Sequence, residues 1–88
     1  MYDKFVGSTE NYNFWNDMNE PEDFTVGNGN LIPMDTLHYT IEKLSYEHRD
    51  LHNAYGALMQ RSSFNGLMKR NENAMRNFVL TRSWFMGS

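Results

Sequence analysis

The pattern of apolar and polar positions divides this 88-residue chain into a strand, a loop, a helix and a second strand. The aromatic stretch "YNFWND" precedes Pro21 and is typical of a strand, which we place at about residues 12–18. Two prolines and the run "VGNGN" then favour a long loop from about residue 20 to 45, without a sustained regular element.

A helix is predicted next, at about residues 46–65. Its apolar residues recur at the spacing i, i+3, i+4 and i+7: Leu51, Ala54, Tyr55 and Leu58. Glu47 and Asp50 would place negative charge in its first turns, where the helix dipole favours it.

The final segment, "NFVLTRSWF", holds the continuous apolar run Phe78, Val79 and Leu80, which is typical of a buried parallel strand at about residues 77–83. Strand, loop, helix and strand form a βαβ unit, whose crossover requires the two strands to be parallel. One such unit cannot bury its own faces. We therefore expect the chain to be part of a larger α/β fold.

Composition excludes several classes of function. A net charge of −3, with its basic residues scattered, disfavours nucleic acid as a partner. No apolar run approaches the roughly 20 residues that cross a bilayer, and the first ten residues do not read as a signal peptide. The absence of cysteine excludes disulfides and thiolate metal sites. The many aromatic residues indicate either an ordinary core, which is commoner, or a sugar-facing surface.

The candidate chemistry lies where the two predicted strands end, because parallel α/β folds carry their sites there. Those ends hold Asp17 and Arg82, an acid and a guanidinium that could share one pocket. From the residues alone, a capping aspartate and an arginine in a structural ion pair explain the pattern equally well.

Three histidines, His38, His48 and His52, raise the possibility of a zinc site. Arg49 stands where a zincin motif requires its glutamate, so we predict no metal and expect ordinary histidines bonded to loop backbone.

Three ordered motifs resemble glycoside hydrolase family 31, the α-glucosidases: "WNDMNEP", "EHRDLHNAYG" and "RNFVLTRSWFMGS". The resemblance covers almost the whole chain and is greatest for the branch that includes endoplasmic reticulum glucosidase II and the neutral α-glucosidases. It implies an α/β fold, a partial (β/α)8 TIM barrel contributing one strand-loop-helix-strand unit.

The resemblance also implies site residues. Asp17 would be the nucleophile that attacks a terminal α-linked glucose with retention, Trp15 and Met18 would line the sugar pocket, and Arg82 would contact substrate or steady the acids. If the strand persists, Asp17 and Asn19 are expected to share one side of it and Glu20 to face away. Glu20 would then serve as an anchor behind the pocket. Small or apolar residues are usual in the family where Glu22 and Asp23 stand.

The resemblance implies no cofactor, an oligosaccharide substrate, a regulatory β-subunit and, for that branch, N-glycan processing in the endoplasmic reticulum lumen. In the family the acid/base aspartate lies on the next strand, beyond Ser88, so this chain is expected to lack it. The alternative is a non-catalytic remnant with at most weak sugar or partner binding, indicated by the missing acid and the unclosed barrel.

Overall fold

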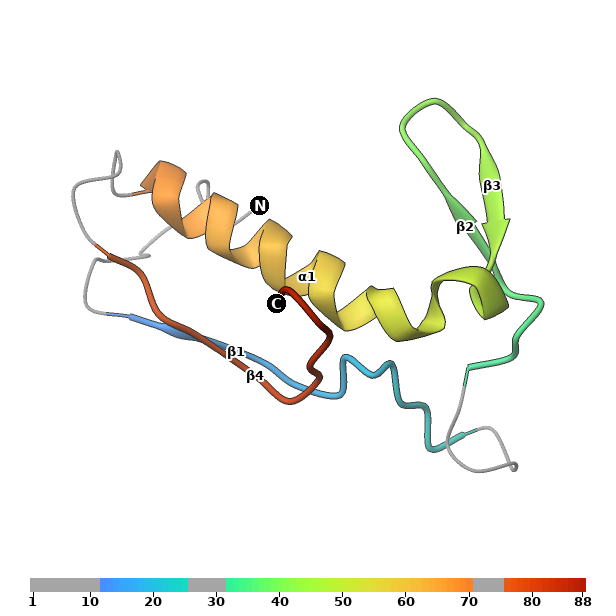
Figure 1. Cartoon of the computed structure of the whole chain (residues 1–88), viewed down its shortest axis with the longest axis horizontal. Helices are drawn as coiled ribbons and strands as arrows, with labels where there is room; N and C mark the ends of the chain where they lie inside the picture. The colour runs from blue at the N-terminus through green and yellow to red at the C-terminus, as the bar shows by residue number, and fades with distance from the viewer. Residues whose placement is uncertain (1–11, 26–31, 71–75) are drawn as a thin grey trace.

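A computed structural model of the chain describes residues 12–25, 32–70 and 76–88. The elements in chain order are β1 (Phe14–Asn16), β2 (Leu37–Tyr39), β3 (Ser45–Glu47), α1 (His48–Arg70) and β4 (Val79–Thr81). They form two separate two-stranded sheets. The β1–β4 pair lies alongside α1, while β2 and β3 stand at the beginning of the helix (Figure 1).

The β1–β4 pair is parallel, with the register Phe14↔Val79, Trp15↔Leu80 and Asn16↔Thr81. The chain passes from β1 to β4 through α1, which is the strand-helix-strand connection that the sequence pattern predicts. β1 and β4 lie inside the ranges 12–18 and 77–83 predicted for them, but each spans only three residues. The prediction that the run Phe78, Val79 and Leu80 is buried is wrong for this chain, since Phe78 and Leu80 are exposed and Val79 is half-buried.

The segment predicted as a long loop ends in a β-hairpin, which sequence reasoning missed. β2 is antiparallel to β3, and Thr40 N donates to Leu44 O across 2.9 Å to close the connection. Lys43 adopts a positive φ of 64° in that turn. The prolines and the glycine-rich run that predicted the loop all precede the hairpin.

Helix α1 begins directly after β3, so Glu47 belongs to the strand and not to the first helical turn as predicted; Asp50 does lie there. The helix start is held by backbone bonds: His48 N donates to Thr36 O (2.8 Å) and Arg49 N to Met34 O (2.9 Å). These contacts satisfy donors that a helix start leaves unpaired. The helix continues to Arg70, beyond the end predicted near residue 65.

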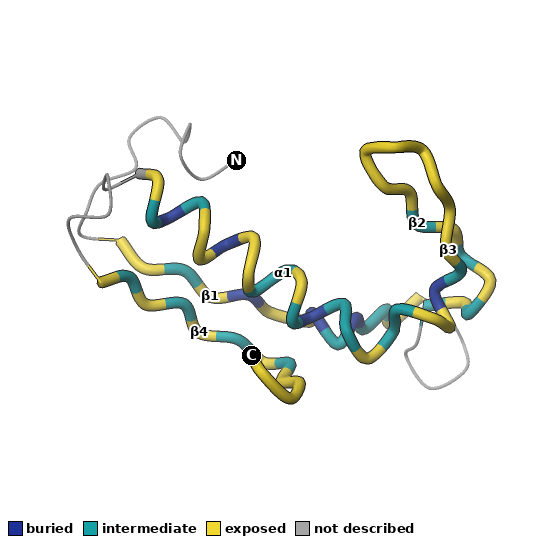
Figure 2. The backbone as a smooth tube through the Cα atoms, turned by 45° about the horizontal axis from the view of Figure 1, so that its top comes forward, coloured by how far each residue is buried: buried dark blue, intermediate teal, exposed yellow. Residues whose placement is uncertain are grey.

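The interior between α1 and the β1–β4 pair is mainly polar. Buried positions recur along α1 and at the end of β1 (Figure 2). Among the described residues the buried large hydrophobic side chain is Leu67, and the buried polar ones are Asn16, Asn19, His48 and Ser63. None of the buried side-chain nitrogen or oxygen atoms in the described ranges is without a hydrogen-bond partner.

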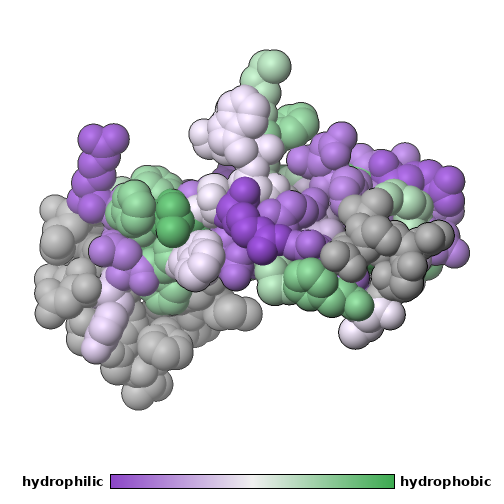
Figure 3. Space-filling model, turned by 90° about the horizontal axis from the view of Figure 1, so that it is seen from below, coloured by the Kyte–Doolittle hydropathy of each residue, from purple (hydrophilic) through white to green (hydrophobic). Residues whose placement is uncertain are grey.

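Within the described ranges, the aromatic side chains do not form the ordinary core that the composition favours. Trp15 is 62% exposed and Trp84 76% exposed. Seen from below, hydrophobic patches lie on both sides of a hydrophilic centre (Figure 3). A single strand-helix-strand unit has too little interior to cover its rings. Within the described ranges, no helix combines the length and apolar character that a membrane crossing requires.

Candidate active site

The ends of β1 and β4 are fixed to each other by side-chain hydrogen bonds. Asn19 Nδ2 donates to Thr81 Oγ1 (2.8 Å), and the Ser83 backbone N–H donates to Asn19 Oδ1 (3.1 Å). The Thr81 hydroxyl in turn donates to the Ser83 carbonyl oxygen (3.0 Å). Because Asn19 is almost completely buried, these bonds are shielded from water and hold the two strand ends at a fixed distance.

A second set of bonds fixes β1 to the helix. Asn16 Nδ2 lies 3.0 Å from Ser63 Oγ and 3.2 Å from Gln60 Oε1, and Ser63 Oγ lies 3.1 Å from Asn16 Oδ1. Gln60 Nε2 donates to the Val79 carbonyl oxygen of β4 (3.2 Å). One helix face thus contacts both strands through polar groups.

Gly56 permits α1 to approach the strand ends closely. A Cβ atom built at Gly56 would lie 2.4 Å from Ser83 Oγ and 2.6 Å from both Asn19 O and Ser83 Cβ. No side chain larger than hydrogen fits there without displacement. Helix α1 therefore sets the position of the two segments that follow β1 and β4.

The segment after β1 is a tight turn, not a continuation of the strand. Met18 adopts a positive φ of 54°, an uncommon conformation for a residue with a Cβ, and its N–H lies 3.0 Å from Asp17 Oδ1. The Glu22 N–H donates to Met18 O (3.0 Å) and closes the turn. Since the strand ends at Asn16, alternation no longer decides where the following side chains lie.

This turn overturns two orientations expected from the sequence. Asn19, expected on the same side as Asp17, is buried, whereas the Asp17 side chain is 42% exposed. Glu20, expected to face away, contacts the same guanidinium as Asp17.

Arg82 is the centre of the cluster. Its Nε and Nη2 atoms donate to the two oxygens of Glu20 at 2.8 and 3.2 Å, which is a two-point pairing. Nη2 also contacts Glu22 Oε2, and Nη1 lies 3.7 Å from Asp17 Oδ1. The structure therefore brings Asp17, Glu20 and Arg82 together as candidate site residues and adds Glu22, which was noted in the sequence only as a departure from the family pattern.

The pairing keeps both partners charged. Hydrogen bonds from Arg82 lower the pKa of Glu20 below its ordinary value, and the same contact raises the pKa of Arg82. Glu20 and Arg82 therefore form an ion pair at neutral pH, with the side chains of Asp17 and Glu22 beside the same guanidinium.

Neither Trp15 nor Met18 lines any of three hollows in the described part of the chain. Trp15 is exposed on β1 and Met18 is 36% exposed in the turn. A shallow polar hollow of about 320 Å³ does adjoin the cluster, lined by Glu20, His52, Asn53, Ser83, Trp84 and Phe85. Sequence reasoning missed Asn19 and Ser83, although Asn19 directly follows the first predicted strand and Ser83 is the last residue of the second.

The three histidines contact one another and not loop backbone as expected. His38 Nε2 lies 2.8 Å from His48 Nδ1, and His48 Nε2 lies 2.7 Å from His52 Nδ1. Burial, followed by the neighbouring His52 and His38, lowers the pKa of His48. A neutral ring has one donor and one acceptor, so three neutral rings satisfy this row. No metal-binding group of histidines and carboxylates occurs among the described residues.

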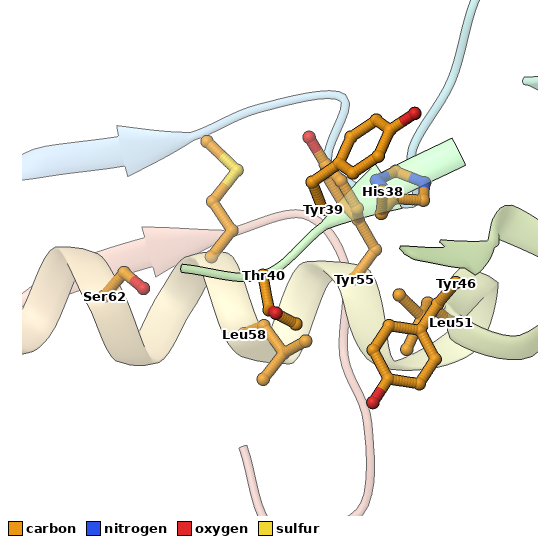
Figure 4. Close-up of a pocket in the computed structure, with 9 residues that line it drawn as sticks. His38, Tyr39, Thr40, Tyr46, Leu51, Tyr55, Leu58 and Ser62 are labelled. Carbon is orange, nitrogen blue, oxygen red and sulfur yellow. The ribbon is translucent and has the colours of Figure 1, made fainter. Parts of the chain in front are cut away.

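A larger hollow, about 470 Å³, lies between the hairpin and α1, away from Asp17 and Arg82 (Figure 4). Its lining includes Leu51, Tyr55 and Leu58, three of the four residues of the apolar stripe predicted for the helix. The apolar stripe thus faces the hairpin. The opposite face of α1, which includes Gly56, Gln60 and Ser63, contacts the strands and the segments that follow them.

The chain matches the family described as "Glycosyl hydrolases family 31 TIM-barrel domain" over residues 1–88. It is 45% identical over 99% of its length to "Probable glucan 1,3-alpha-glucosidase" of Oryza sativa subsp. japonica and, at the same identity and coverage, to "Glucosidase 2 subunit alpha" of Schizosaccharomyces pombe. It is 43% identical to human "Neutral alpha-glucosidase AB", again over 99% of the chain.

The chain spans about 9% of the length of these relatives. A match along all 88 residues and identities above 40% nevertheless settle its ancestry. The chain belongs to glycoside hydrolase family 31, within the TIM-barrel domain of that family.

Proposed function

We propose that the whole protein containing this chain is a retaining α-glucosidase and that Asp17 is its nucleophile. The observation that carries the proposal is the position of Asp17 directly after β1, beside Arg82 directly after the parallel strand β4, with Nη1 3.7 Å from Asp17 Oδ1. Catalytic groups of TIM barrels stand at such strand ends.

A retaining glycosidase needs an ionised carboxylate that can attack the anomeric carbon of the sugar. Asp17 is placed for this attack because its side chain is accessible and the guanidinium of Arg82 stands beside it. The attack would form a bond between an Asp17 oxygen and C1 and release the leaving alcohol, which takes a proton from a general acid. Water would then hydrolyse the glycosyl-enzyme ester.

The general acid must be a protonated carboxyl group about 5 Å from the nucleophile. Glu20 does not suit this role, since its bonds to Arg82 lower its pKa and keep it ionised. We therefore assign Glu20 to anchoring Arg82 and expect the acid to come from another part of the barrel.

Arg82 would bind the substrate through Nη1. Glu20 and Glu22 occupy Nε and Nη2, whereas within the described ranges no acceptor lies within hydrogen-bond distance of Nη1. Its two N–H groups are thus available to a sugar hydroxyl beside the nucleophile. Trp15 and Met18, exposed near this point in sequence, are proposed to contact the glucose ring once the barrel is complete.

The proposed substrate, partner subunit and cellular location rest on the relatives. One of them is named "Glucosidase 2 subunit alpha", which supports an oligosaccharide with terminal α-linked glucose as substrate and a second subunit as partner. N-glycan trimming in the endoplasmic reticulum lumen, without a cofactor, follows from the same resemblance.

The test is a covalent trap on the full-length protein. A fluorinated α-glucosyl fluoride slows hydrolysis of the glycosyl-enzyme, so the labelled peptide can be mapped by mass spectrometry. We expect the label on Asp17 and loss of turnover in Asp17→Asn. Asp23→Asn is the matched control, because the Asp23 carboxylate accepts hydrogen bonds from Thr25 and not from Arg82. A label on any other residue, or near-normal turnover of Asp17→Asn, removes Asp17 from the role.

A further inference from the structure

Glu22 is the least exposed of the three carboxylates around Arg82. The exposed fraction of its side chain is 22%, compared with 35% for Glu20 and 42% for Asp17. Its backbone N–H closes the turn onto Met18 O, so its position relative to Arg82 is fixed by the fold and not only by the ion pair. Lower exposure leaves its charge less screened by solvent.

The three carboxylates contact different sets of nitrogen atoms of the Arg82 guanidinium. A guanidinium has five N–H groups, one on Nε and two on each Nη. Glu20 takes one from Nε and one from Nη2, and Glu22 contacts Nη2 as well. This leaves Nη1 facing Asp17, at a distance too long for a hydrogen bond. Glu20 and Glu22 thus both contact Nη2, whereas Asp17 lies nearest to Nη1.

We propose that Glu22 is a positioning residue for the nucleophile, which acts through Arg82. Its carboxylate contacts Nη2 of the guanidinium and offsets part of the positive charge that would otherwise stabilise ionised Asp17. This inference rests on the proposed function, because it assigns to Glu22 a control over the basicity of the proposed nucleophile.

Other charged groups around Asp17 define what a pH measurement reports. Asp17, Glu20 and Glu22 come from the segment after β1, and Arg82 comes from the segment after β4. From α1, His52 lines the hollow that also includes Glu20. His52 is present in the wild type and in the variants of Glu22 alike, so a difference between their profiles isolates Glu22.

The experiment is the pH dependence of kcat/KM of the full-length protein with an aryl α-glucoside, in which the acidic limb reports the pKa of the nucleophile in the free enzyme. Removing a like charge favours ionisation of Asp17. In Glu22→Gln we expect the limb to move to lower pH by about 0.3–1 unit, the range for one partly screened charge. Glu22→Ser should shift it in the same direction, and Glu22→Asp should restore the wild-type limb.

Asp23→Asn is the control, because it removes the same charge from a neighbouring residue that bonds Thr25. Its limb should coincide with that of the wild type. An unchanged or raised limb in Glu22→Gln and Glu22→Ser overturns the inference, and so does an equal shift in Asp23→Asn. These outcomes leave the labelling of Asp17 untouched, so failure of this inference and failure of the proposed function are separate results.

Discussion

Replacing Gly56 with alanine tests whether the close approach of α1 fixes the two strand ends. The added Cβ would lie 2.6 Å from Asn19 O, at least 0.8 Å short of ordinary van der Waals contact. The Ser83 side chain can rotate to move its Oγ, but Ser83 Cβ and the Asn19 carbonyl belong to or adjoin the backbone. Relief therefore requires the segments after β1 and β4 to move away from the helix.

Two opposing free energies decide the result. Alanine stabilises a helix interior by about 1 kcal/mol relative to glycine. Overpacking a well-filled site costs about 1–3 kcal/mol, and contact with two backbone segments places this site at the upper end. We expect a net loss of about 2 kcal/mol in the free energy of unfolding.

The functional effect should exceed the loss of stability. Asn19 and Ser83 each adjoin a residue of the charged cluster, Glu20 and Arg82. A displacement near 1 Å at a reacting centre costs on the order of 10²-fold in rate. We therefore expect kcat/KM of the full-length Gly56→Ala protein to fall by roughly 10–100-fold at temperatures where it remains folded.

The assay combines thermal inactivation with steady-state kinetics on the full-length protein. Asn65→Ala is the control: it adds helix propensity at an exposed site of α1 and should leave kcat/KM unchanged. The double variant Gly56→Ala/Ser83→Gly removes two of the three close contacts and should recover part of the loss. A Gly56→Ala protein as stable and as active as the wild type would refute the packing described here.

Three further predictions follow from the same contacts. Ser63→Ala removes the hydroxyl that bonds buried Asn16 and should lower stability by about 1–2 kcal/mol in thermal unfolding, whereas exposed Ser62→Ala should not. The pKa of His48 is lowered in the folded state, so the unfolded state binds more protons. The stability of the fold is therefore retained above about pH 6.5 and falls as the pH drops through the folded pKa of His48. Amide hydrogen exchange of β2 and β3, corrected for intrinsic rates, should accordingly become faster between pH 7.5 and 5. Arg82→Lys keeps the charge but loses the two-point pairing and should reduce kcat/KM at least tenfold; an unchanged value would exclude the pairing from catalysis.

The strand-helix-strand order could be predicted because each element has a local signal. The apolar run before Thr81 and the i, i+3, i+4 spacing from Leu51 each lie within one element, so they can be recognised without long-range contacts, although Phe78, Leu80 and Leu58 are at least half exposed in this chain. The hairpin has no such signal. Its strands span three residues each, its connection lacks the Asn-Gly or Asp-Gly pair that marks tight turns, and a lysine occupies the positive-φ position.

The polar interior could not be predicted from hydropathy. Asn16, Asn19 and Ser63 read as surface residues, because hydropathy scores a side chain without the partner that satisfies it. The orientation of Glu20 was wrong for a related reason. Alternation applies only while a strand persists, and nothing in the residue type of Met18 indicates that the chain turns there with a positive φ.

Hydrogen bonds between buried polar side chains can fix the register of the two strands, which apolar packing alone could not. Asp17 and Arg82 each follow one member of the register pair Asn16↔Thr81, so the distance between them depends on that register. A slip by one residue would shift one strand by about 3.3 Å and turn its side chains to the other face. Three-residue strands have few ladder bonds to resist a slip, and apolar side chains accept several neighbours. Asn16 bonds Ser63 and Gln60, and Asn19 bonds Thr81 and Ser83. A slipped register would leave these buried amide groups unpaired. The interior of this chain is therefore polar where the position of Asp17 relative to Arg82 has to be specified.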